Sequence, residues 1–250
     1  MRVIFLEVEY IGTNYCGFQI QNSSRPDEVT VQEVLEKALK KLFVRDIRVE
    51  YTSRTDSGVH ARAQGVAFTI DTGIKLSKIK LALNSYLPFD IRVKKILEYE
   101  KGWRVRYAVA SKVYRYKIDN KKEQSVFDYD FSWQVRQPLS LTLMRQAAAL
   151  IIGKRDFSMF AKKAKKYDNP VRTVKDIIIR TRGRFIFIDV EADGFLRGMV
   201  RNIVAFLVAV GLEQMTLKQV KDVLAKKQYY MNKPAPAKGL CLWKTNYKKD

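Results

Sequence analysis

The sequence predicts an α+β fold (an α/β protein in the broad sense) built from two halves of split βαβ type. Two observations support this prediction. Apolar residues alternate with period two in some segments and recur at helical spacing in others. The order βαββαβ occurs once and then returns in similar form. Two ferredoxin-like or RRM-like halves of this kind would join into one mainly antiparallel sheet flanked by helices.

The first half is expected at residues 1–110. Alternation predicts a strand at Val3–Tyr10, and apolar residues on one side predict a helix at Val31–Phe43. The elements that follow are strands at Ile47–Thr52 and Gln64–Ile70, a helix at Ile79–Tyr86 and a strand at Ile91–Tyr99.

The second half is expected at residues 111–250, with a helix at Leu217–Lys226 as an insertion before its last strand. We expect the polar stretch Asn120–Gln137 to connect the halves. The elements are a strand at Val113–Ile118, a helix at Leu141–Ile152, strands at Val174–Thr181 and Phe185–Ala192, a helix from about Leu196 to Gly211, and a strand near Leu240–Asn246.

The chain is strongly basic. It has 47 lysines and arginines against 26 acidic residues, a formal net charge of +21. Such an excess is difficult to explain without a polyanionic partner. A membrane surface is the rival polyanion, but we find no basic amphipathic helix with a bulky apolar face. RNA is therefore the expected partner.

Cys16, Cys241 and the single histidine, His60, support neither a disulfide framework nor a zinc site. A phosphate-binding loop of the GxxxxGK[ST] type is absent, so we expect no cofactor and no metal. The amino terminus is too short and too acidic for a signal peptide, and the apolar run Ile203–Leu212 is too short to span a bilayer. We expect a soluble cytoplasmic protein.

The segment SRTDSGVHA, Ser53–Ala61, places one carboxylate, Asp56, two residues after Arg54 in a turn between two predicted strands. On a strongly basic protein, a lone acid in such a turn is a candidate nucleophile directed at RNA. The alternative is a plain surface turn, because Asp and Ser-Gly favour turns on their own account. Spacing alone leaves both interpretations open.

SRTDSGVHA resembles the GRTDxGVHA signature of the tRNA pseudouridine synthase A family, and further segments match the family in order along nearly the whole chain. They are YIGTNYCGFQIQN from Tyr10, VQE at Val31–Glu33, LNSYLPFDIRV ending at Val93, KVYRY ending at Tyr116, GKRDFSMF from Gly153, PVRTV from Pro170, GFLRGMVRNIV from Gly194 and AKGLCLW from Ala237. The resemblance implies the pseudouridine synthase fold. It also implies an isomerase that converts uridine to pseudouridine in the anticodon arm of tRNA, at roughly positions 38 to 40, by flipping the target nucleotide.

The resemblance implies roles for four residues. Asp56 corresponds to the nucleophile that bonds covalently to the target uridine. Arg201 corresponds to the arginine that pairs with this aspartate and keeps it charged. Tyr114 corresponds to the active-site tyrosine that packs against the flipped uracil and helps to remove the proton from carbon 5. Arg54 corresponds to the arginine that enters the RNA stem in place of the extruded nucleotide.

Three of these residues also have a simpler interpretation. Arg201 would be a cation on a helix surface, Tyr114 a core tyrosine sharing a strand face with Tyr116 and Ile118, and Arg54 a phosphate contact.

The signature also contains Gly58 and His60, which we expect to be structural, the glycine for an unusual backbone angle and the histidine for a satisfied hydrogen bond. Ser53 stands where the family usually has glycine, and Phe18 where it usually has tryptophan. Neither departure replaces a chemical group.

The resemblance further implies a homodimer whose two subunits grip one tRNA. The main alternative function is a non-catalytic, RRM-like RNA-binding module, because RGRFIFIDV at Arg182–Val190 places Phe185 and Phe187 on one strand face. The pattern of such a module is incomplete, so we expect both phenylalanines in the core. A deaminase or a methyltransferase would lack its metal ligands or its glycine-rich loop.

Overall fold

The computed structural model describes residues 1–21, 28–123, 125–162, 167–227 and 233–248. Asn22, which ends the first family-like segment, lies outside them. The chain forms two compact units, Met1–Ala110 with Leu242–Asp250, and Ser111–Cys241. The mixed α+β class and the mainly antiparallel strand pairing are confirmed within each unit.

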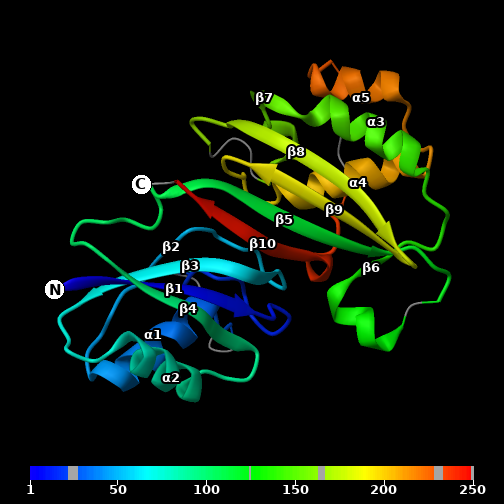
Figure 1. The fold of residues 1–250 in the computed structure, drawn as a ribbon. Helices are drawn as coiled ribbons and strands as arrows, with labels where there is room; N and C mark the ends of the chain where they lie inside the picture. The colour runs from blue at the N-terminus through cyan, green and yellow to red at the C-terminus, as the bar shows by residue number, and fades with distance from the viewer. Residues whose placement is uncertain (22–27, 124, 163–166, 228–232, 249–250) are drawn as a thin grey trace. The chain divides into compact units, whose positions relative to one another are not determined.

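The first unit is a sheet with two neighbouring helices (Figure 1). Its strand order is β4-β1-β3-β10, and β1 is antiparallel to both β3 and β4. The short β2 pairs with β3. The elements are β1 (Arg2–Tyr10), α1 (Val31–Phe43), β2 (Glu50–Tyr51), β3 (His60–Ile70), α2 (Leu76–Tyr86), β4 (Ile91–Tyr99) and β10 (Leu240–Tyr247).

β10 explains why the C-terminal residues group with the first unit. The Thr245 hydroxyl donates to the carbonyl of Ala63 in β3 at 2.8 Å, and the Tyr247 ring packs edge-on against Phe5 in β1. Our division from the sequence had placed these residues with the second half. The pattern of a strand does not state which neighbour the strand will join.

β1 is apolar on both faces, as a central strand should be. Val3 and Phe5 pack with Ala67 and Val105, while Ile4 on the opposite face is fully buried. This platform matters for the site because Tyr10, the last residue of β1, pairs with Ala61 near the start of β3. The loop after β1 and the loop before β3 therefore begin side by side.

Two predicted strands of the first unit have other bounds. Of Ile47–Thr52, only Glu50–Tyr51 pairs with β3. The strand predicted at Gln64–Ile70 begins already at His60, because β1 continues to offer pairing partners as far as Ala61. The helices and the remaining strands of this unit lie where they were predicted, within a few residues.

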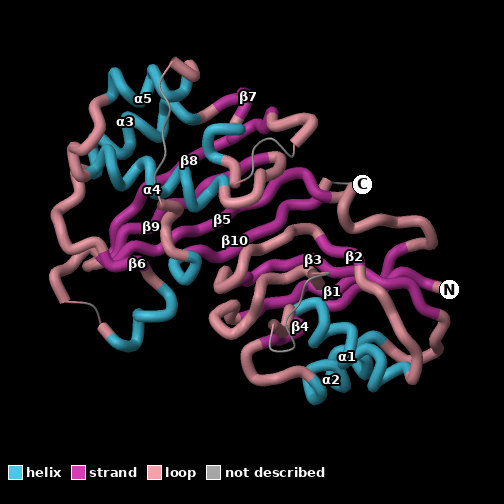
Figure 2. Tube along the Cα trace, turned by 180° about the vertical axis from the view of Figure 1, so that it is seen from behind, coloured by secondary structure: helices cyan, strands magenta, loops and turns pink. Residues whose placement is uncertain are grey.

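The second unit is also a helix-flanked sheet, with strand order β5-β9-β8-β7 and antiparallel pairing along it. Seen from behind, α3 and α4 cover β8 and β9 (Figure 2). Its elements are β5 (Val109–Asp119), η1 (Val126–Phe131), β6 (Trp133–Gln134), α3 (Leu141–Ile151), β7 (Gly153–Asp156), η2 (Ser158–Phe160), β8 (Val171–Arg182), β9 (Phe185–Ala192), α4 (Met199–Gly211), α5 (Leu217–Leu224) and η4 (Ala237–Gly239).

α4 is the central helix of this unit, and eleven of its thirteen residues are buried. The two that are only half-buried are Arg201 and Asn202, in its first turn. A helix that is apolar almost all round must be enclosed. None of the helices described is long and apolar enough to cross a membrane.

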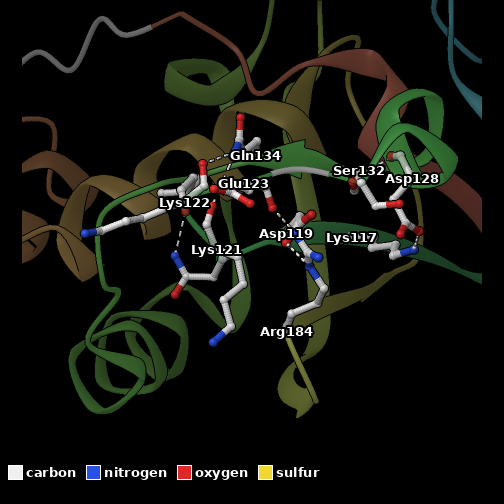
Figure 3. Close-up of polar contacts among 12 residues, drawn as sticks. Lys117, Asp119, Lys121, Lys122, Glu123, Asp128, Ser132, Gln134 and Arg184 are labelled. Carbon is white, nitrogen blue, oxygen red and sulfur yellow. Dashed lines mark hydrogen bonds and ion pairs between the residues drawn. The ribbon is translucent and has the colours of Figure 1, made fainter.

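The stretch Asn120–Gln137 does not connect the units, contrary to the prediction. It lies inside the second unit and forms η1 and β6, which runs parallel to the end of β5. Ion pairs join Lys117 to Asp128 at 2.6 Å and Arg184 to Asp119 at 2.8 Å (Figure 3). The mixed charges that suggested a linker therefore hold a folded segment in place.

Phe185 and Phe187 are not core residues, and that prediction was wrong. Both are half-buried, on the face of β9 opposite its buried isoleucines. The Lys117 ammonium lies 3.9 Å from the centroid of the Phe185 ring, and the Arg115 guanidinium 5.7 Å from that of Phe187. Cations from β5 cover these rings in place of apolar side chains.

Candidate active site

Asp56 lies in the loop between β2 and β3, in the first unit. Its side chain is half-buried, Arg54 is exposed, and Thr55 between them is buried. The Thr55 hydroxyl lies 2.8 Å from the hydroxyl of Tyr10 at the end of β1. The buried threonine thus ties the loop to the sheet, with the arginine and the carboxylate on either side of it in the sequence.

A second loop, residues 11–18, holds the Asp56 loop by its backbone. The amide of Phe18 donates to the carbonyl of Thr55 at 3.3 Å, and the carbonyl of Tyr15 accepts from the amide of Gly58 and from the hydroxyl of Ser57, each at 3.2 Å. These bonds span the carboxylate on both sides in the sequence. The position of Asp56 is therefore fixed by main-chain contacts, not by its own side chain alone.

The close approach of the two loops requires glycine. A Cβ on Gly17, whose φ is +91°, would lie 2.6 Å from the carbonyl oxygen of Thr55 and 3.3 Å from the carbonyl carbon of Asp56. Any other residue would be strained and would also push the Asp56 loop away. The family-like segment from Tyr10 is thus the structural partner of SRTDSGVHA.

Tyr15 anchors this second loop to a third. Its hydroxyl donates to the Asp90 carboxylate at 2.7 Å. Burial, and then the hydrogen bond to Asp90, raise the pKa of Tyr15 above its ordinary value, so the phenol remains a donor.

Gly58 and His60 are structural, as predicted. Gly58 has a φ of +76°, and the buried His60 accepts a hydrogen bond at Nδ1 from the amide of Gly12 at 3.0 Å. Among the described residues, the non-glycine positions with positive φ do not include Ser53, so serine fits where the family usually has glycine. Phe18 is fully buried, and the centroid of its ring lies 4.8 Å from that of Tyr51.

Tyr114 lies in β5, in the second unit, and is 6% exposed. Its ring meets Phe195 edge-on, with 5.1 Å between centroids. Phe195 belongs to the loop that leads into α4, so Tyr114 packs beside the approach to Arg201.

Arg201 is the third residue of α4. Its Nε donates to the carbonyl of Ala235 at 2.6 Å, and its own carbonyl accepts from the amide of Ala235 at 3.2 Å. The Nε bond uses one of the five N–H donors of a guanidinium. The arginine is half-buried, so the interpretation as a plain surface cation does not describe it.

Sequence reasoning missed Tyr116, which is fully buried and donates from its hydroxyl to the carbonyl of Pro236 at 2.7 Å. Two signals were present. KVYRY contains a second tyrosine on the same strand face as Tyr114, and prolines stand on both sides of Ala235.

The two units therefore offer different chemistry. The first presents a half-buried carboxylate in a braced loop, which suits a nucleophile. The second presents a phenol and a guanidinium, which suit packing against a base and pairing with a carboxylate.

Comparison with known proteins identifies the family of this chain. A family model described as tRNA pseudouridine synthase matches residues 7–108 and 147–248. Asp56, Arg54 and Arg201 fall inside these stretches, and Tyr114 falls between them.

Similar curated proteins are called tRNA pseudouridine synthase A. The one from Thermoanaerobacter sp. (strain X514) is 40% identical over 99% of this chain and 100% of its own length. Those from Brevibacillus brevis and Thermosipho melanesiensis are 37% and 42% identical, over 99% and 98% of this chain and 100% and 99% of their own length. Among solved structures, an archaeal box H/ACA sRNP Nop10-Cbf5 complex matches with a TM-score of 0.35 and 11% identity, over 82% of this chain and 54% of that chain. This likeness is too weak to be used as evidence. With a family model across both units and relatives along its whole length, the chain belongs to the tRNA pseudouridine synthase family.

Proposed function

We propose that this enzyme converts uridine to pseudouridine in the anticodon arm of tRNA, at roughly positions 38 to 40, on a nucleotide flipped out of the RNA. The observation that carries the proposal is the bracing of the Asp56 loop by the backbone of residues 11–18. A plain surface turn needs no such support. A nucleophile must be held within a fraction of an ångström of its productive position, which makes the bracing useful.

Asp56 is the proposed nucleophile. Its carboxylate bonds covalently to the uridine, the bond from the ribose to N1 breaks, and the base rotates. A bond from the ribose to carbon 5 then forms, and the bond to the carboxylate breaks, which returns Asp56 to its free state. Carbon 5 loses a proton and N1 gains one, so substrate and product have the same atoms. The reaction is an isomerisation without net oxidation or reduction, and we propose no cofactor for it.

Arg201 and Tyr114 are the proposed partners of Asp56. A guanidinium favours the ionised form of a carboxylate and orients it through a fork of donors. Tyr114 would pack against the uracil, with its hydroxyl placed to help remove the proton from carbon 5.

Arg54 would replace the flipped nucleotide in the RNA stem. Flipping costs a few kcal/mol of lost stacking, and a cation that fills the gap offsets part of that cost. Its side chain is exposed, two residues before the half-buried Asp56 in the sequence, which supports this role. The formal net charge of +21 supports phosphate contacts and a steep salt dependence of binding.

The proposal includes a cytoplasmic homodimer that grips one tRNA. Analytical ultracentrifugation tests the dimer, because two copies would sediment with twice the 29.1 kDa mass of one chain.

The variant Asp56→Ala tests the function. It should form no pseudouridine on tRNA transcripts while binding them within about threefold of wild type, since phosphate contacts dominate affinity. Asp46→Ala is the control, because Asp46 lies in the same unit with a side chain that is 85% exposed. Pseudouridine formed by Asp56→Ala would refute the assignment. If the wild-type protein binds tRNA but forms no pseudouridine, the non-catalytic RNA-binding module would be favoured.

A further inference from the structure

The segment Ala235–Gly239 contacts both Arg201 and Tyr116 within the second unit. Arg201 Nε donates to the carbonyl of Ala235 at 2.6 Å, and the Tyr116 hydroxyl donates to the next carbonyl, that of Pro236, at 2.7 Å. The amide of Ala235 also donates to the carbonyl of Arg201 at 3.2 Å. Two consecutive carbonyls therefore link the tyrosine to the arginine.

This segment is stiff. Pro234 and Pro236 lie on both sides of Ala235, and each proline fixes its own φ while restricting the residue before it. Pro236 has φ −51° and ψ 141°, and Ala235 is 1% exposed. Few backbone rotations remain free between the two carbonyls, so a displacement of the Pro236 carbonyl is passed on in part to Ala235.

Tyr116 is itself closely enclosed. It is 0% exposed, and a Cβ on Gly239 would lie 2.6 Å from its Cζ. Burial raises the pKa of Tyr116 well above its ordinary value, against the opposing effect of the nearby Arg201 charge. The phenol therefore stays protonated and acts as a hydrogen-bond donor throughout the working pH range.

We propose that Tyr116 is a positioning residue that sets the orientation of the Arg201 guanidinium through the carbonyls of Pro236 and Ala235. The inference rests on the proposed role of Arg201 in the reaction and adds a residue to it. Tyr116 does not touch the uridine in this account, whereas its neighbour on the same strand face, Tyr114, does. A buried hydroxyl that only stabilises the fold is the competing explanation.

Tyr116→Phe removes one oxygen atom and separates the two explanations. We expect kcat on tRNA to fall roughly 10- to 100-fold, because a small misplacement of a catalytic group has effects of that size, while KM stays within about threefold. A purely stabilising hydroxyl would lower the thermal midpoint and leave kcat per folded enzyme unchanged, and that result would overturn the proposal.

Tyr247→Phe is the matched control. The Tyr247 hydroxyl oxygen is buried and, among the described residues, has no hydrogen-bond partner. It belongs to the first unit, where its ring packs against Phe5, whereas Ala235–Gly239 belongs to the second. Its removal should change neither kcat nor KM.

A double-mutant cycle shows whether Tyr116 acts through Arg201. In an Arg201→Met background, measured under single turnover, Tyr116→Phe should produce no further loss, because the side chain that it orients is already absent. The same fold loss in both backgrounds would overturn the proposal. If Arg201→Met itself leaves the rate unchanged, the proposed role of Arg201 fails, and this outcome is distinct from a failure of Tyr116 alone.

Should Tyr116→Phe not fold, Pro236→Ala tests the same link. It leaves Tyr116 intact, keeps a carbonyl at position 236 and frees the backbone angle that proline fixes. A lower kcat at unchanged KM supports the proposal, and a wild-type kcat overturns it.

Discussion

The two units hold their proposed catalytic groups in different ways. In the first, Asp56 lies in a loop whose position comes from main-chain hydrogen bonds and from the close approach of Gly17. In the second, Tyr114 and Arg201 lie on regular elements, the strand β5 and the first turn of a buried helix. Asp56 is placed by contacts between loops, whereas Tyr114 is placed by its strand and by the Phe195 ring, and Arg201 by its helix and the main chain of Ala235.

This difference predicts that substitutions will act differently in the two units. A strand or a helix tolerates many changes around it, because its hydrogen-bond ladder remains. A loop that is packed against a glycine tolerates few substitutions there, because one added methyl group would overlap the main chain of the facing loop. A substitution in the second unit should therefore remove a functional group without moving its neighbours. A substitution at the glycine of the first unit should instead displace Asp56 without changing its carboxylate.

The largest effect is expected for Arg201→Met, which removes the cation of the second unit and keeps most of its bulk. The rate of product formation should fall roughly 10²- to 10³-fold, the size typical of losing one preorganised charged donor. Binding to tRNA should change little in comparison. Single-turnover kinetics and a binding assay on the same preparation measure both quantities.

Arg182→Met is the control for net charge, because Arg182 is an exposed arginine at the end of β8. It should leave the rate near wild type. Unchanged turnover in Arg201→Met would show that the second unit contributes no charge to the reaction.

A smaller effect, on placement, is expected for Gly17→Ala in the first unit. The positive φ costs alanine about 1 kcal/mol, and the overlap with the Thr55 carbonyl adds roughly 1–3 kcal/mol. We expect a lower free energy of unfolding and a reduced kcat, because the Asp56 loop must move. Denaturant unfolding measures the loss in free energy of unfolding, and steady-state kinetics measure the change in kcat.

Gly102→Ala isolates the overlap from the backbone angle. Gly102 has a φ of +97°, and a Cβ there would meet nothing within 4 Å. Gly102→Ala should lower the free energy of unfolding only by the cost of the backbone angle, about 1 kcal/mol, and should keep full activity. Equal behaviour of the two alanine variants would mean that the close approach of the loops has no importance.

The smallest effect concerns an ion pair of the second unit away from Arg201 in the chain. Burial alone would raise the pKa of Asp156, but hydrogen bonds from Lys226 and Ser158 outweigh it, so the pKa lies below its ordinary 3.8. This contribution to stability is fully present above the ordinary pKa and is lost as the pH falls through the lowered value.

Asp156→Asn should therefore cost about 0.5–1 kcal/mol at neutral pH, as expected for a partly exposed pair, and less in strong acid, with kcat unchanged. Thermal unfolding at several pH values checks this. A loss that grows toward acid pH would contradict the assignment.

Much of the fold followed from hydrophobic periodicity. Val31–Phe43, Ile91–Tyr99 and Phe185–Ala192 have the predicted bounds. β7 was missed because GKRD has no apolar pattern, and its strand state depends on pairing with β8. The Asn120–Gln137 segment was mistaken for a linker because ion pairs with partners far along the chain cannot be inferred from composition.

For the site, the sequence supplied the candidate residues and the resemblance supplied their roles. The bracing of Asp56 was not predictable, because it depends on backbone contacts between segments about forty residues apart. Tyr116 was missed because its partner, Pro236, lies 120 positions away. Long-range contacts leave no local pattern.

The most direct test of the account is the pseudouridine content of tRNA from cells that lack this protein and carry either the wild-type chain or Asp56→Asn. We predict that pseudouridine is missing from the anticodon arm without the protein, returns with the wild-type chain and does not return with Asp56→Asn. Pseudouridine that persists without the protein, or that returns with the variant, would contradict the claim that this carboxylate performs the reaction.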